Sequence, residues 1–221
     1  FGTSAGTVGG VTGTEGNLTI TGSDGFGSWL GGVTLNRVNL FVSAGVVLTT
    51  GDLTVNKSTT LSGTGTLSGS GSVTVGGDIS VVGGTLMTGN MVITQAAGHT
   101  VTIASDGVQM ADIRSTTIST PNAVSVSGSV FLFAATVASA DQLTLAPGTN
   151  VTGANGVLQA AGVITTTGTA PVTTNELRIT GTSSSLGSDL KVGGIGVTAT
   201  GSLTIPTGRT LSLDQTVWPV T

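Results

Sequence analysis

The sequence predicts an all-β protein, a parallel β-solenoid (β-helix) with sides of roughly six residues and no significant helix. Residues 61–84 read as four consecutive blocks, LSGTGT, LSGSGS, VTVGGD and ISVVGG. A second run, VTGANG, VLQAAG and VITTTG, occupies residues 151–168. An aliphatic residue opens each block: Leu61, Leu67, Val73, Ile79, Val151, Val157 and Val163. Repetition at a short fixed period is typical of solenoids, so we expect these residues to form a narrow core.

A recurring aliphatic–Thr–aliphatic triplet is the third observation that predicts this fold. Successive side chains of a β-strand point to opposite faces, so the aliphatic residues of a triplet point inward and its Thr points outward. Val and Thr also favour strands. The outward threonines are Thr19, Thr34, Thr54, Thr74, Thr102, Thr144 and Thr204.

The inward aliphatic residues are expected to continue between the two runs of blocks. They are Leu86, Val92, Val101, Val108, Ile113, Ile118, Val124, Val130, Val137 and Leu143. Gly and Ser lie between them, as the corners of a coil require, because Gly adopts tightly bent backbone conformations without steric cost.

Two arrangements fit a six-residue step. One is a triangular parallel coil with about eighteen to twenty residues per turn. The other is an antiparallel meander of short hairpins, which would need Asn-Gly or Asp-Gly turns at regular places. Within the predicted solenoid, residues 33–214, only Asn155-Gly156 and Asp106-Gly107 provide such turns, which favours the parallel coil.

The chain divides into three parts by composition. Residues 1–32 are expected to form an N-terminal arm and cap, residues 33–214 the solenoid, and residues 215–221 a C-terminal tail or cap. Large side chains are rare in this chain but occur near both ends, at Phe26, Trp29, Phe41 and Trp218. Because Trp and Phe are enriched where interfaces bury apolar area, these four residues are the predicted subunit contacts.

Composition excludes several classes of function. Charged residues make up 7% of the chain, aromatic residues 3%, and the formal net charge is −4. With 38% hydrophobic residues at regular spacing, the chain does not have the composition of a disordered protein. The six basic residues are scattered, which argues against nucleic acid as a partner. The longest nearly apolar run, residues 130–140, is too short for a membrane span.

The sequence predicts no catalytic residue, no cofactor and no metal. The chain contains no Cys, and its one histidine, His99, is expected at a corner or on the surface. Asp52, Asp78, Glu176 and Asp189 each precede a strand-opening aliphatic residue, where an acidic side chain forms a turn.

Two alternatives to a purely structural role remain open. Carboxylates from different turns could converge on a groove, as glycoside cleavage requires, which would make the protein a carbohydrate-processing enzyme. A stacked array of outward threonines could instead bind ice. Thr54 and Thr74 are twenty residues apart and would be neighbours on one face, but the series is expected to break there.

Two stretches carry a resemblance to known groups of proteins. Residues 61–84 resemble the Gly/Thr-rich repeat modules of bacterial surface and secreted adhesins, including autotransporter passengers. Residues 175–213 (NELRITGTSSSLGSDLKVGGIGVTATGSLTIPTGRTLSL) resemble the repetitive fibre proteins of tailed phages. Both resemblances imply a non-enzymatic structural or adhesive role at an extracellular, cell-surface or virion location. They also imply partners: a homo-oligomer or filament, and a cell-surface glycan or host receptor. The start at Phe1 is compatible with a processed, secreted chain.

Overall fold

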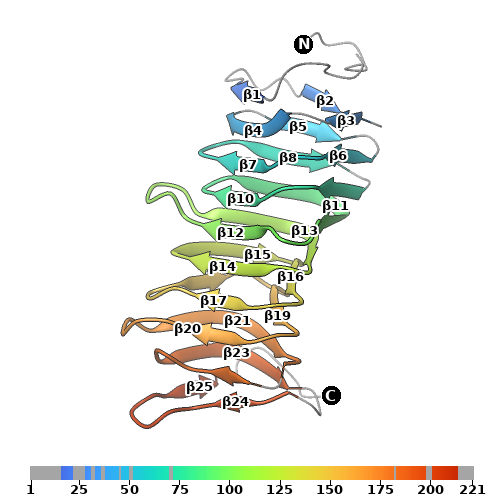
Figure 1. Ribbon diagram of the computed structural model, residues 1–221. Helices are drawn as coiled ribbons and strands as arrows, with labels where there is room; N and C mark the ends of the chain where they lie inside the picture. The colour runs from blue at the N-terminus through green and yellow to red at the C-terminus, as the bar shows by residue number, and fades with distance from the viewer. Residues whose placement is uncertain are drawn as a thin grey trace.

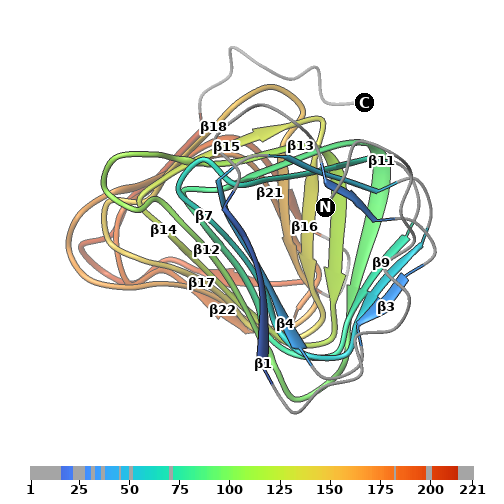
Figure 2. The ribbon, with the colours of Figure 1, turned by 90° about the horizontal axis from the view of Figure 1, so that it is seen from above.

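The chain folds as a parallel β-solenoid, as predicted. The computed structural model describes residues 16–21, 28–30, 33–35, 38–44, 46–49, 52–69, 72–181, 183–197 and 201–213. Throughout these residues the regular structure is strand, and no helix occurs. Successive coils stack along one axis (Figure 1). Figure 2, a view along that axis, shows a roughly triangular cross-section with three faces, which we call A, B and C.

Face A is a ten-stranded parallel sheet in which each strand pairs with the strand of the next coil. Its strands are β1 (Gly16–Thr21), β4 (Val38–Ala44), β7 (Thr59–Ser62), β10 (Ile79–Val82), β12 (Thr100–Ala104), β14 (Ala123–Ser127), β17 (Leu143–Leu145), β20 (Ile164–Thr166), β22 (Ser184–Ser185) and β24 (Leu203–Thr204).

Faces B and C belong to one fifteen-stranded sheet, because four long strands bend around the corner between them. Face B contains β2 (Ser28–Leu30), β5 (Val46–Thr49), β8 (Thr66–Gly69), β15 (Ser129–Phe133), β18 (Asn150–Thr152) and β25 (Leu211–Leu213). Face C contains β3 (Val33–Leu35), β6 (Leu53–Val55), β9 (Ser72–Val75), β16 (Thr136–Ser139) and β19 (Val157–Ala160). The long strands are β11 (Thr85–Gln95), β13 (Ala111–Thr120), β21 (Val172–Ile179) and β23 (Leu190–Val197).

The register places aliphatic residues on aliphatic residues in adjacent coils. Leu67 pairs with Leu86 on face B, and Val73 pairs with Ile93 on face C. The ladders between the named strands are parallel, which excludes the antiparallel meander. Coil length varies more than predicted: neighbours in adjacent coils are 20 residues apart at Asp52 and Ser72, but 25 apart at Gln95 and Thr120.

The core is the continuous stack of inward aliphatic side chains inside the triangle. Of the predicted core residues, Leu61, Leu67, Val73, Ile79, Val151 and Val157 are buried. The prediction for Val163 is wrong: this residue is half-buried, and Ile164 is fully buried instead. The reason is a slip of one residue, because β20 begins at Ile164.

Two further expected core positions, Val92 and Val108, are exposed. Val92 lies on the outer surface of β11, where its neighbour Ile93 points inward. Val108 lies in the loop of residues 105–110 between β12 and β13, which projects at the left of Figure 1. That loop lengthens its coil, so the residues within it are not on a side of the triangle.

The corners depend on close approach between coils. A Cβ atom placed on Gly65 would lie only 1.9 Å from the carbonyl oxygen of Val42 in the preceding coil. Only Gly allows this approach, which explains why Gly recurs at the corners of the sequence blocks. Gly63, at the same corner, has a positive φ of 57° that Gly adopts without strain.

The predicted arm and tail are described only in part. Within residues 1–32, strand β1 pairs with β4 and strand β2 pairs with β5, so both continue the sheets of the solenoid. The predicted tail, residues 215–221, lies outside the described residues.

Candidate functional site

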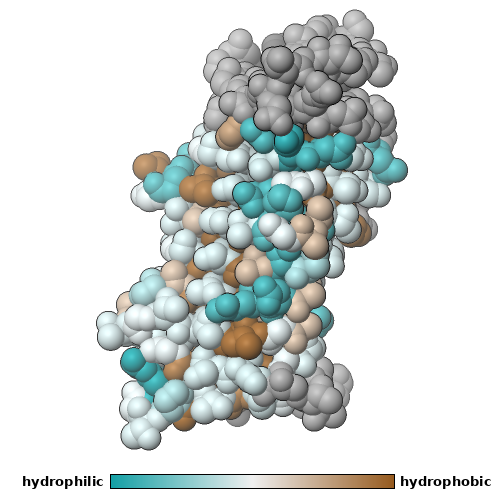
Figure 3. Space-filling view, in the orientation of Figure 1, coloured by the Kyte–Doolittle hydropathy of each residue, from teal (hydrophilic) through white to brown (hydrophobic). Residues whose placement is uncertain are grey.

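A file of hydroxyl side chains runs along the outside of face A. Its members are in register from coil to coil and half-exposed or exposed: Thr60, Ser80, Thr102, Ser125, Thr144, Thr165, Ser185 and Thr204. Adjacent strands are about 4.8 Å apart, so the file repeats at that spacing. In the space-filling view, most of the coloured surface is pale, which is the colour of near-neutral hydropathy (Figure 3).

A second file lies on face C and extends further than the sequence predicted. Thr54, Thr74 and Thr94 are in register on β6, β9 and β11, and the backbone of Thr34 on β3 pairs with Thr54. Ser119 on β13 continues the file. The expected break after Thr74 is therefore wrong, because Thr94 on the long strand β11 lies outside the aliphatic–Thr–aliphatic triplets.

Acidic side chains at the corners bind the backbone of the following coil. Asp52 Oδ1 accepts hydrogen bonds from the backbone N–H and the hydroxyl of Ser72, at 3.0 and 3.1 Å. Asp78 Oδ1 accepts from Thr100 N–H at 2.8 Å, and Asp189 Oδ1 accepts from Thr210 N–H at 2.9 Å. The bonds from Ser72 lower the pKa of the Asp52 carboxyl. These three residues lie at corners, as predicted, but their carboxylates bind the next coil and not their own turn.

Glu176 does not follow that prediction. It lies within β21, where its side chain forms an ion pair with Arg178, with 2.5 Å between Arg178 Nε and Glu176 Oε1. The pair arises because residues two apart on a strand point to the same face.

His99 lies at a corner, as predicted. Its Nδ1 is 3.8 Å from Asp78 Oδ1, and both side chains are partly exposed. The described residues contain no group of three or more His, Cys, Asp or Glu side chains that could hold a metal ion.

A buried polar network lies where face C turns into face A. Gln95 Nε2 donates to the carbonyl oxygens of Gly77 (2.9 Å) and Thr100 (2.8 Å). Gln95 Oε1 accepts from Thr120 Oγ1 (2.6 Å) and from Asn122 Nδ2 (2.9 Å). Each polar atom of the Gln95 side chain is thus engaged with an adjacent coil.

Asn122 carries the same network across the corner. Its Nδ2 also donates to the Ala96 carbonyl oxygen at 2.6 Å, and its Oδ1 accepts from Gly98 N–H at 2.7 Å. Ser139 Oγ in the next coil donates to the Asn122 carbonyl oxygen at 2.7 Å. These bonds satisfy backbone groups of the loop at residues 96–99, so the network holds that loop in place.

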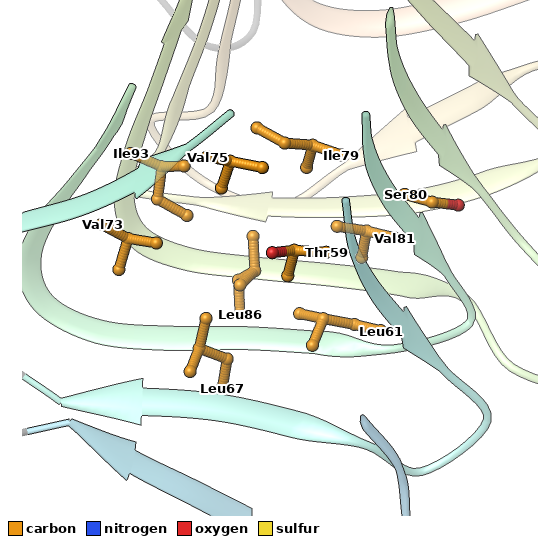
Figure 4. Close-up of a pocket in the computed structure, with 10 residues that line it drawn as sticks. All are labelled: Thr59, Leu61, Leu67, Val73, Val75, Ile79, Ser80, Val81, Leu86 and Ile93. Carbon is orange, nitrogen blue, oxygen red and sulfur yellow. The ribbon is translucent and has the colours of Figure 1, made fainter. Parts of the chain in front are cut away.

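One small cavity lies in the apolar core. Its volume is about 10 Å³, and its lining includes Leu67, Val73, Leu86 and Thr59. Figure 4 shows Thr59 among the apolar side chains around the cavity, whereas the Ser80 hydroxyl points away. Thr59 Oγ1 is buried and has no hydrogen-bond partner among the described residues. The cavity is at the lower limit of the volume that holds one water molecule, so it cannot admit a substrate.

A cluster of charged and aromatic side chains lies on the outside of face B. Asp112 binds Arg114 through two oxygens, with 2.8 Å from Arg114 Nε to Oδ1 and 2.8 Å from Nη2 to Oδ2. The guanidinium lies over the ring of Phe131, with Cζ 5.0 Å from the ring centroid. The rings of Phe131 and Phe133 are parallel within 2°, with centroids 6.4 Å apart. The hydrogen bonds to Asp112 raise the pKa of Arg114.

Of the four predicted subunit contacts, the two that the structure describes lie on strands outside this cluster. Phe26 and Trp218 lie outside the described residues. Trp29 lies in β2 and pairs with Leu48. Phe41 lies in β4 on face A, where it is half-buried and pairs with Thr60. Their role as contacts stays a prediction.

The face-B cluster was missed by sequence reasoning, although two signals for it exist. In VFLF, Val130 and Leu132 alternate with Phe131 and Phe133, so one pair must point outward. In the DIR segment of residues 112–114, opposite charges flank an aliphatic residue and therefore share a face.

No protein-family model, curated protein or solved structure matches this chain. Within the described ranges, no helix has the length and hydrophobicity needed to cross a membrane.

Proposed function

We propose that this chain is a non-enzymatic structural or adhesive module of an extracellular filament, cell surface or virion fibre, and that it associates with copies of itself. One observation carries the proposal: the corner carboxylates Asp52, Asp78 and Asp189 bind backbone N–H groups of the next coil. These side chains stack coils, and a stack of parallel coils is a rigid spacer.

Composition supports the part of the proposal that concerns self-association. Charged residues, which keep copies of a protein apart, make up only 7% of the chain. The outer faces carry files of hydroxyl groups, which bind polar surfaces of many kinds without the cost of burying a charge.

Light scattering at rising protein concentration, together with a polysaccharide-degradation screen, tests the proposal. We expect a mass that rises above that of the 21.4 kDa chain and no release of sugar fragments. A constant mass would contradict self-association. Fragment release that Asp→Asn changes at the corners abolish would instead establish the carbohydrate-processing alternative.

Ice binding is a second candidate, favoured by the length of the hydroxyl file on face C. The side chains of Thr54, Thr74 and Thr94 repeat at the strand spacing, as binding to a periodic surface requires. Thermal hysteresis that Thr74→Lys abolishes would support this function. No hysteresis in the unchanged protein would exclude it.

A further inference from the structure

We propose that two copies of this chain associate through the outside of face B and the adjoining loop of residues 105–110, at a surface that we call the B-face patch. It consists of Val108, Met110, Asp112, Arg114, Phe131 and Phe133. The inference rests on the proposed function, which includes self-association, and adds where the contact lies. Strands β13, β15 and β18, which carry or border most of the patch, lie on the upper side of the triangle in Figure 2.

The residue types of the patch are those of protein interfaces. Val108 is 91% exposed, Met110 49% and Phe133 44%. Arg, Met and aromatic residues are enriched at the centres of interfaces, and Lys, Glu and Asp are depleted there. Asp112 is the exception in this patch, and its charge is neutralised by Arg114. Few large apolar side chains of the described residues are so exposed. Val108 and Met110 lie in the loop that leads directly into β13, and Phe133 lies on β15, which pairs with β13. Their grouping therefore indicates a surface that is covered in an assembly.

The loop that carries Val108 is held rigid before any contact forms. Asp106 Oδ1 accepts hydrogen bonds from Val108 N–H at 2.9 Å and from Gln109 N–H at 2.6 Å. Asp106 N–H in turn donates to the Gln109 carbonyl oxygen at 3.1 Å. This closed turn presents an apolar side chain to solvent, so little conformational entropy remains to be lost on association.

The charged and aromatic part of the patch is fixed in the same way. Asp112 holds the Arg114 guanidinium through two hydrogen bonds, and the guanidinium covers one face of Phe131. The opposite face of that ring is turned toward the next coil, where the register partner of Phe131 is Thr152. Ordered aromatic and Arg side chains of this kind are typical hot spots of binding.

A second copy of the chain is the partner that this surface fits. The patch carries one negative and one positive side chain, so two copies do not repel each other. In a two-fold dimer each copy presents the same patch, and the neutral Asp112–Arg114 pair of one copy can face that of the other. A nucleic acid would require an excess of positive charge, and a glycan would leave Val108 and Met110 without apolar contacts.

Single substitutions on the full chain, with light scattering as the measurement, test this inference. Phe133→Ser and Val108→Asp should weaken association by roughly 30-fold each, because each removes an apolar anchor of the interface. Val92→Ser is the matched control, since Val92 is as exposed as Phe133 (44%) but lies on face C. It should leave association unchanged. Circular dichroism should give the same melting temperature for all four proteins.

Single-cysteine crosslinking locates the contact independently, because the chain contains no Cys. Under mild oxidation, Val108→Cys or Met110→Cys should form disulfide-linked dimers, and Val92→Cys should not. If association persists in the patch variants and crosslinks form only at cysteines placed elsewhere, the inference fails while the proposed function stands. If the unchanged chain does not associate at any concentration, both fail. Binding to a glycan array that the patch variants abolish, with association intact, also overturns the inference.

Discussion

The stretch of residues 52–95 and the stretch of residues 96–133 use the same three-sided coil in different ways. In the first, neighbours in adjacent coils are 20 residues apart and the interior is a stack of aliphatic side chains. In the second, loops at residues 96–99 and 105–110 lengthen the coils. There the Gln95–Asn122 network holds the first loop, and the second loop carries Val108 and Met110 of the B-face patch.

We interpret this difference as a division between a scaffold and a surface for contacts. Regular coils need only apolar residues at the right phase, and their outer surfaces carry small hydroxyl side chains. A coil with extra residues exposes additional backbone polar groups, which specific buried side chains must satisfy. Departures from a repeat are costly, and natural proteins retain them where they serve function. We therefore infer that the regular coils act as a rigid spacer and that the lengthened coils carry the contacts between copies of the chain.

Introducing a charge into the regular core should have the largest effect. Leu67 is fully buried between coils, so Leu67→Asp would bury a carboxylate without a partner. We expect a loss of about 4 kcal/mol or more in the free energy of unfolding, measured by urea denaturation. Leu67→Met keeps the volume and should cost less than about 1.5 kcal/mol. A folded, equally stable Leu67→Asp variant would contradict the assigned core.

Breaking the polar network should destabilise the lengthened coils. Gln95→Leu leaves the carbonyl oxygens of Gly77 and Thr100 without their donor, at a cost of about 3 kcal/mol. Thr94, next to Gln95 on the same strand, points outward, so Thr94→Ala should change stability by less than about 0.5 kcal/mol. Equal effects of the two substitutions would show that the network does not hold the loop.

Removing a polar group from the regular core should raise the free energy of unfolding, whereas the two preceding changes lower it. Thr59 Oγ1 is buried without a partner beside the small cavity, so Thr59→Val should stabilise the protein by about 1 kcal/mol. Thr60→Val, which changes the outward neighbour, serves as the control and should give no gain. A loss of stability in Thr59→Val would mean that the hydroxyl binds a water molecule in the cavity.

The smallest expected effect is the pH dependence of the corner bonds. Hydrogen bonds from Ser72 lower the pKa of Asp52 below its ordinary value of 3.8. Because the folded-state pKa is the lower one, this contribution is present above pH 3.8 and is lost as the pH falls through the folded-state pKa. Asp52→Asn keeps the acceptor oxygen but cannot titrate. Thermal melts between neutral and acidic pH should therefore decline slightly less for this variant, and identical declines would argue against the bond.

The regular coils could be predicted from sequence because their period is undisturbed. Leu61, Leu67, Val73 and Ile79 open blocks of equal length, and all four are buried. The shift of the buried position from Val163 to Ile164 could not be predicted. One extra residue in a corner that is made of Ala and Gly does not stand out in the sequence.

The face-B cluster and the partners of Gln95 could not be predicted from the sequence for a different reason. Alternation in VFLF requires one pair of side chains to point outward but does not say which, since a shift of one residue exchanges the two faces. Only the pairing of Val130 with the buried Ala111 places Phe131 and Phe133 outside. The partners of Gln95 are equally unpredictable, because Thr120 and Asn122 come from a coil 25 or more residues away.

Hydrogen exchange measured by mass spectrometry at two protein concentrations tests the division into scaffold and contact most directly. At the higher concentration, amides of residues 105–114 and 129–133 should exchange more slowly, because association covers the B-face patch. Amides of residues 52–69 and 72–95 should exchange at the same rate at both concentrations. Slowing confined to residues 52–95, or exchange that is independent of concentration throughout the chain, would contradict the account.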